Sequence, residues 1–188
     1  MAYPTTPTFA TMGVESVDPT LFTETVSGRV QSRKIASQKW KFTASYPPLT
    51  RDEFSPVWGY LMAQRGRHKV FTVVIPELST TSGTATGTVT TSATAVGSSL
   101  VPVTGLTGTL KIGDFVKFAG HDKVYAIIAD LTGDGDLSIT PELVRPLGTE
   151  TVTYHNVPFT VRMANDIQTF KVGKGMMFTN EVDFVEAL

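Results

Sequence analysis

The chain has 188 residues, enough for one large domain or for a domain with a small insert. It contains no cysteine, so disulfides and thiolate metal ligands are excluded. The 16 basic and 17 acidic residues give a net charge of −1, whereas a protein that wraps nucleic acid needs a surplus of Lys and Arg. The N-terminus lacks the pattern of a signal peptide, and no apolar run approaches the roughly 18 residues of a membrane span. We therefore expect neither tight nucleic-acid binding nor membrane insertion.

Residues 1–26 are rich in Thr and Pro and have few periodic apolar positions. We expect an extended arm with room for one short strand, or a flexible terminus. From Arg29 to Tyr46 the pattern becomes strand-like, and within residues 38–46 it alternates, so that Trp40, Phe42 and Ala44 share one face. This alternation predicts a half-buried strand, which Pro47 and Pro48 end.

One helix is predicted, over about residues 51–65. Thr50 and Glu53 have the spacing of a capping box, and Phe54, Val57, Trp58 and Leu61 follow at helical spacing. We expect Gly66 to take the left-handed position after the helix, with Arg65, Arg67 and His68 close to the last carbonyls.

Residues 69–76 read as a second strong strand that ends at a proline. The next segment, 79–109, contains no charged residue, and 21 of its 31 residues are Ser, Thr or Gly. A structureless loop of that length is uncommon inside a compact domain, so we interpret it as a linker plus the first strands of a small module. Short alternating strands with turns between them continue this module, with turns at 120–123 and 133–136 and strands at 114–118, 124–129 and 137–141.

Longer strands return at 157–163, 169–173 and 176–188. The predicted fold is mainly β: a tube-type antiparallel β-sandwich or barrel with one helix and an inserted small β-barrel. Residues 1–78 and 156–188 form the sandwich domain, which includes the arm 1–26, and residues 79–155 form the insert. In the last strand Phe178, Val182 and Phe184 share parity, and Asn180 is the polar exception.

Motifs for catalysis or metal binding are not found in the sequence. The histidines, His68, His121 and His155, lack the tight spacing of a zinc site. Asp130, Asp134 and Asp136 faintly suggest a calcium loop, but the twelfth position from Asp130 is Pro141 rather than Glu. We interpret these aspartates as parts of a hairpin turn and expect no cofactor and no metal.

The remaining charged and aromatic clusters also have simple explanations. Glu181 and Asp183 share one face of a strand, which indicates a solvated or interface-facing edge. The basic run 65–69 allows a phosphate or nucleic-acid site, but a helix end that attracts cations explains it better. Because a carbohydrate platform needs its aromatic rings exposed together, we interpret as core the residues Trp40, Phe42, Phe54, Trp58 and Phe71. We infer that the protein is not an enzyme and has no catalytic residues.

The order of elements is more specific than any single motif. Trp40-Lys-Phe leads through Tyr46-Pro-Pro-Leu-Thr-Arg-Asp-Glu-Phe54 into the helix, then to Gln64-Arg-Gly-Arg67 and Val70-Phe-Thr-Val-Val-Ile-Pro76. Later segments are Leu110-Lys-Ile-Gly-Asp-Phe-Val-Lys-Phe118, Lys123-Val-Tyr125, Leu137-Ser-Ile-Thr-Pro-Glu-Leu143 and the C-terminal stretch 178–188. Together these resemble the distal tail proteins and related minor tail proteins of tailed bacteriophages, over most of residues 38–188.

The resemblance implies a virion component assembled in the host cytoplasm, a subunit of a hexameric ring at the end of the tail. Its partners would be copies of itself, the tail tube protein and the hub or baseplate proteins, and DNA would only pass through the channel. The chain lacks the long carbohydrate-binding domain of larger members. The alternatives are another tail protein, such as a tube, terminator or adaptor, or a carbohydrate-binding module for host attachment.

Overall fold

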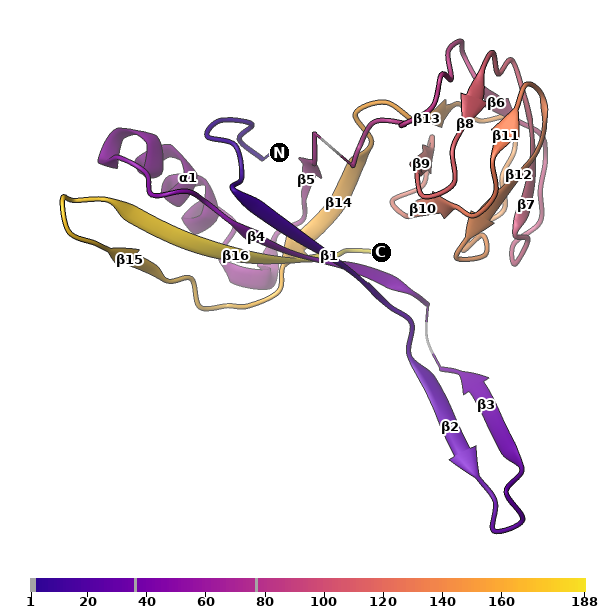
Figure 1. Cartoon of the computed structure of the whole chain (residues 1–188), viewed down its shortest axis with the longest axis horizontal. Helices are drawn as coiled ribbons and strands as arrows, with labels where there is room; N and C mark the ends of the chain where they lie inside the picture. Colours follow the sequence, from indigo (N-terminus) through magenta and orange to yellow (C-terminus); the bar gives the residue numbers. More distant parts are fainter. Residues whose placement is uncertain (1–2, 36, 77) are drawn as a thin grey trace. The chain divides into compact units, whose positions relative to one another are not determined.

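The computed structural model describes residues 3–35, 37–76 and 78–188 and is mainly β, as the sequence predicts. It contains sixteen strands, one α-helix and one 3₁₀ turn in the described ranges (Figure 1). The chain divides into two compact units. The barrel unit comprises Tyr3, Phe71–Thr160 and Ala187–Leu188, and the sheet unit comprises Pro4–Val70 and Val161–Glu186. The expected insert 79–155 lies inside the barrel unit.

The main sheet has the strand order β1-β4-β16-β14-β5, and β15 pairs with β16 outside this path. Its strands are β1 (Thr11–Val17), β4 (Lys39–Ser45), β5 (Phe71–Val74), β14 (Pro158–Met163), β15 (Phe170–Val172) and β16 (Phe178–Glu186). These pairs are antiparallel, and β4 pairs with β1 along its whole length and with β16 over residues 41–45 on its other side. The alternation in β4 is as predicted, with Trp40, Phe42 and Ala44 buried and the residues between them exposed.

Strand β1 lies in the segment 1–26, for which we expected an extended arm with room for one short strand, and it forms an outer strand of the main sheet. All seven residues of β1 pair with β4, from Thr11 opposite Ser45 to Val17 opposite Lys39. The limits of β1 cannot be predicted because its sequence alternates only weakly. As an outer strand, β1 is half-buried at only three positions, so it needs few apolar residues.

Helix α1 (Arg51–Ala63) begins and ends close to the predicted limits. The predicted capping box forms, and the Thr50 N–H donates to Glu53 Oε2 at 2.9 Å. The helix buries Phe54, Val57 and Leu61. The ring of Phe54 stacks on that of Phe178 in β16, with centroids 5.0 Å apart. This apolar contact holds the helix on the sheet.

The end of α1 differs in detail from the prediction. Gln64 is the C-cap, and Arg65, rather than Gly66 alone, takes the left-handed conformation (φ 55°) before the 3₁₀ turn η1 (Gly66–His68). Backbone N–H groups of Gln64 and Lys69 complete the end of the helix, so the cations are not needed there. Arg67 instead donates from Nε to the carbonyl of Ala164, at 2.7 Å.

In the barrel unit, six short strands form a sheet that nearly closes on itself (Figure 1). The order is β13-β9-β10-β12-β7-β6. These strands are β6 (Thr90–Thr91), β7 (Leu100–Thr104), β9 (Phe115–Phe118), β10 (Val124–Ile127), β12 (Gly135–Thr140) and β13 (Val152–Thr153). A bridge between Thr90 and Thr151 joins the first strand to the last, and the N–H of Val152 donates to the carbonyl of Val89 at 2.9 Å. Closure leaves little free sheet edge in this unit.

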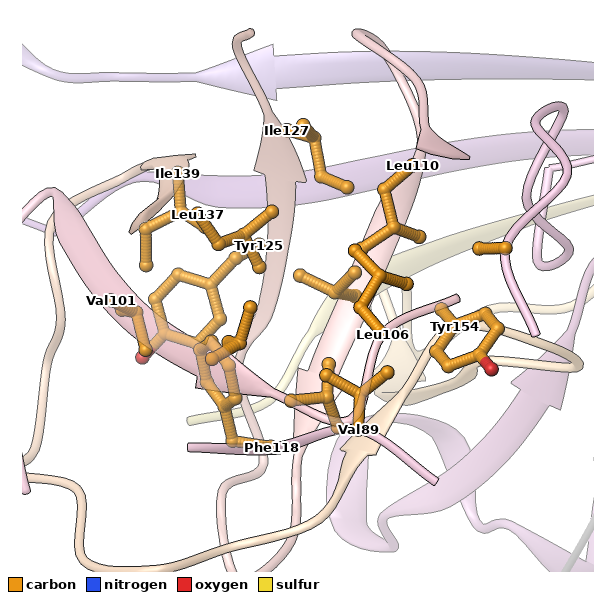
Figure 2. Packing of buried hydrophobic residues seen from close by; sticks show 14 of the residues in the cluster. Val89, Val101, Leu106, Leu110, Phe118, Tyr125, Ile127, Leu137, Ile139 and Tyr154 are labelled. Carbon is orange, nitrogen blue, oxygen red and sulfur yellow. The ribbon is translucent and has the colours of Figure 1, made fainter. Parts of the chain in front are cut away.

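A small second sheet pairs β8 (Thr109–Leu110) with β11 (Leu131–Thr132). The turn 133–136 was predicted to form a hairpin, but that is wrong, because β11 pairs with β8 whereas β12 pairs with β7 and β10. The turn therefore carries the chain from one sheet to the other. Inside the barrel lies one apolar cluster, shown in Figure 2, that includes Val89, Val101, Leu106, Leu110, Phe118, Tyr125, Ile127, Leu137, Ile139 and Tyr154.

The Ser/Thr/Gly-rich segment is ordered because its glycines let two stretches of backbone touch. A Cβ on Gly105 would lie 2.4 Å from the carbonyl oxygen of Thr88, and one on Gly108 would lie 2.2 Å from that of Thr84. Both glycines also have φ near +84°, a conformation that other residues adopt only with strain. The glycines that make this segment resemble a flexible linker are thus required by close packing of its backbone.

Substituting Gly108 by Ala should therefore destabilise the protein by roughly 2–4 kcal/mol, because backbone strain and a backbone clash add together. Gly97→Ala is the matched control. Gly97 has φ +81° but no atom within 4 Å of the added Cβ, so only the strain of about 1 kcal/mol applies. Denaturation followed by circular dichroism measures both. Equal losses would show that the close approach contributes nothing.

Asp114 ties the start of this segment to the barrel. Its carboxylate accepts hydrogen bonds from the Thr81 hydroxyl, from the Ser82 N–H at 2.9 Å and from the Lys111 N–H at 3.0 Å. Burial alone would raise the pKa of Asp114, but these hydrogen bonds outweigh it and hold the pKa below the usual value. The charged form is therefore the one that the fold favours.

Asp114→Asn should cost about 2 kcal/mol at pH 7, because an amide cannot accept all of these hydrogen bonds. Since the folded-state pKa is depressed, this stabilisation is present above the unfolded pKa of about 4 and is lost as pH falls through the folded value. The difference between wild type and variant in unfolding free energy should shrink below about pH 4. Asp136→Asn, at an exposed position of β12, should change stability by less than about 0.5 kcal/mol. A constant difference across the pH range would contradict the role of the Asp114 charge.

Candidate assembly surface

Between β1 and β4 the chain forms a hairpin of β2 (Thr20–Glu24) and β3 (Val30–Lys34). The register runs from Thr20 opposite Lys34 to Glu24 opposite Val30. A turn at 25–29 closes the tip, where the Thr25 N–H donates to the carbonyl of Arg29 at 3.0 Å. An ion pair of 3.3 Å between Lys34 and Asp18 joins the two strands at the base.

Every residue from 18 to 35 is exposed, on both faces of the hairpin. Phe22 is 63% exposed, and the other large apolar side chains exposed here are Leu21, Val26, Val30 and Ile35. A two-stranded hairpin without a covered face is marginally stable in water. A surface of this kind indicates contact with another molecule.

The strand-like pattern from Arg29 onward covers β3, but the sequence does not predict its pairing with β2 in a hairpin. Residues 20–24 fell in the expected arm, and no alternation separates a buried face from a solvated one. The available signal was Ser27-Gly28 between two stretches with β-branched residues, because Gly28 supplies the positive φ (+76°) of the turn.

A second apolar surface surrounds the edge strand β15. All three of its residues are exposed, and it pairs with β16 through Phe170 opposite Asn180 and Val172 opposite Phe178. The ring of Phe170 is held against Trp58 of α1, with centroids 4.8 Å apart. We define the β15 edge as residues 167–177, whose exposed large apolar side chains are Ile167, Phe170, Val172, Met176 and Met177.

An open groove of about 600 Å³ lies on the sheet unit. Asp183, which the sequence pairs with Glu181, accepts hydrogen bonds there from the Thr43 hydroxyl at 3.0 Å and the Asn165 amide at 3.1 Å. Its charged lining has both signs, from Glu15, Lys41, Arg67, Arg162 and Asp183. A groove that is lined by charges of both signs, and whose carboxylate Asp183 already accepts hydrogen bonds from the protein, is typical of a solvated sheet face.

The histidines and the aspartates 130–136 each have local roles. His68 and His155 are exposed, and His121 is buried with Nδ1 3.4 Å from the Tyr125 hydroxyl. Asp130 accepts from Lys111 Nζ at 2.6 Å, which together with the Ile112 N–H holds the pKa of Asp130 below its usual value. Asp134 caps the N–H of Leu106 instead, at 2.9 Å. Among the described residues no group of three or more His, Asp or Glu side chains is placed to hold a metal ion.

The five aromatic residues predicted as core are buried or half-buried. Trp40, Phe42, Phe54 and Phe71 are buried, and Trp58 is half-buried beside Phe54. They do not form an exposed stacking platform. In the described parts of the chain no helix has the length and apolar character needed to cross a membrane.

Neither a protein-family model nor a curated protein matches this sequence. The two candidate assembly surfaces are therefore inferred from the structure of this chain alone.

The hairpin should be the first part of the unassembled protein that trypsin cuts, because Arg29, Arg33 and Lys34 lie in fully exposed, weakly stabilised backbone. Mass spectrometry of a time course identifies the first fragments. Arg162, half-buried in β14, is the internal control and should be cut only after unfolding. Cleavage at both places at the same rate would show that the hairpin is as stable as the sheet.

Proposed function

We propose that this protein is a structural subunit of a bacteriophage tail that acts by assembling with copies of itself. The observation that carries this proposal is the hairpin 18–35, which exposes five large apolar side chains and has no core of its own. A monomer gains nothing from such an element, whereas an assembly gains an interface.

The particular role we propose is a ring at the distal end of the tail tube, joining the tube to the hub and leaving a channel for DNA. The sequence resemblance to distal tail proteins supports this role, and the antiparallel β architecture is compatible with it. The net charge of −1 also supports it, because a lumen that passes DNA must not grip it. Function then resides in geometry and not in a reactive group.

Light scattering coupled to size exclusion, followed by negative-stain imaging, tests the proposal. A ring of several copies with a central hole is the expected result. Glycan binding by a stable monomer would point to a host-attachment module instead. A chain that stays monomeric at every concentration tested contradicts the proposal.

A double variant makes the test specific to the hairpin. Leu21→Ser with Phe22→Ser should weaken self-association by roughly tenfold or more, because buried aromatic anchors dominate interfaces. Its unfolding free energy should change by less than about 0.5 kcal/mol, since both side chains are exposed in the single chain. Ile128→Ser, an exposed apolar residue of the barrel unit, is the control and should leave association unchanged. If the control weakens association as much as the double variant, the hairpin is not the interface.

A further inference from the structure

We propose that the hairpin 18–35 of one copy docks against the β15 edge, residues 167–177, of a second copy. This inference rests on the proposed self-association and specifies its two surfaces. Both surfaces are exposed and rich in large apolar side chains, and both belong to the sheet unit.

The strand registers place the two surfaces at opposite ends of β4. At one end Lys39 pairs with Val17, and the hairpin follows directly. At the other end Ser45 pairs with Glu181, and the next residues of β16, 178–180, pair with β15. The seven residues of β4 separate these ends by roughly 20 Å.

The hairpin continues β1 and β4 beyond the end that is farther from β15 (Figure 1). Its tip thus extends away from the β15 edge of its own copy. Docking therefore needs a second copy.

The β15 edge can offer backbone hydrogen bonds as well as apolar contacts. β15 pairs with β16 on one side, and within the described residues no strand pairs with its other side. An open edge accepts an added strand through main-chain hydrogen bonds, and neighbouring side chains give specificity. Phe170, fixed by Trp58, supplies a rigid aromatic contact beside that edge.

The size and charge of the hairpin fit this occupant. Its 18 consecutive exposed residues approach the roughly 20–30 residues that each side of a stable interface contributes. On the face that carries Phe22 and Val30, Lys34 is paired with Asp18, so the remaining charge of that face is Glu24, while Arg33 lies on the opposite face and Arg29 in the turn. It is therefore the Phe22 face that suits the β15 edge. The β15 edge carries Lys171 and Lys174, both exposed and of opposite sign to Glu24.

Contact between two different surfaces of identical chains is heterologous. Each copy then uses its hairpin on one neighbour and its β15 edge on another, so the assembly continues until it closes as a ring or extends as a filament. A two-fold dimer is not the expected product.

The absence of cysteine allows a direct test by thiol cross-linking in the full chain. Ser32→Cys places a thiol on the Phe22 face of the hairpin, and Thr169→Cys places one beside β15. Both changes are small, are at exposed positions and leave the apolar residues intact. Two single-cysteine chains of different mass are mixed and treated with a short bis-maleimide, and the products are separated by mass. Ser99→Cys, exposed in the barrel unit, is the control partner for Ser32→Cys.

A heterodimer of Ser32→Cys with Thr169→Cys in several-fold excess over the control pair, and over Ser32→Cys linked to itself, is the expected result. A chain that carries both cysteines should give a ladder of higher oligomers. Oligomers seen by light scattering without the expected product would overturn this contact and leave the proposed self-association standing. Monomers with no cross-linked product would overturn both.

Discussion

The pairing of β4 with β16 is the contact on which the sheet unit depends. It joins residues such as Phe42 and Phe184 that are far apart in the sequence, and it is reinforced where the Trp40 N–H donates to the buried carboxylate of Glu186 at 3.1 Å. Because loop closure over such a distance is slow and entropically costly, it must be stabilised by burial on the shared face. β1, α1 and β15 all build on this pair: β1 extends it on one side, and α1 and β15 pack at its far end.

The hairpin and the β15 edge lie just beyond the two ends of the β4–β16 pairing. Beyond Lys39 the described residues form no third strand that covers a face of the hairpin. Beyond Glu181 the strand β16 pairs with the three-residue β15 on one side, and on the other it has only a bridge between Phe178 and Leu49 and the hydrogen bond from the Tyr46 N–H to the carbonyl of Asn180. The apolar residues at these two places are therefore exposed, whereas the apolar residues of β4 are buried. Asn180 marks the same boundary: it is buried next to β15, and its side-chain amide has no hydrogen-bond partner among the described residues. A buried amide without partners costs stability.

Strict alternation and helical spacing could be read directly from the sequence, and β4 and α1 were found for that reason. The position of β1 within the segment 1–26 and the hairpin could not, because an edge strand and an arm that is solvated on both faces show no buried stripe. The local sequence pattern also does not predict which strands pair with each other. Gly133–Asp136 has the composition of a hairpin turn, yet tertiary packing places its flanking strands in different sheets. The spacing of Glu181 and Asp183 correctly predicted that they share one face of a strand. The assembly surfaces could not be predicted in this way, because they depend on which strands pair and in which register.

The way in which the barrel begins and ends has a consequence for how such chains can vary. The N–H of Val157 donates to the carbonyl of Ser79 at 2.7 Å, so the chain leaves the barrel at the point where it entered. For the strands on either side, β5 and β14, the residues 80–156 thus act as a single short connection, whatever their number. Because the cost of loop closure grows only slowly with loop length, a related chain can carry a shorter loop or a different module at this point and keep the flanking strands in place.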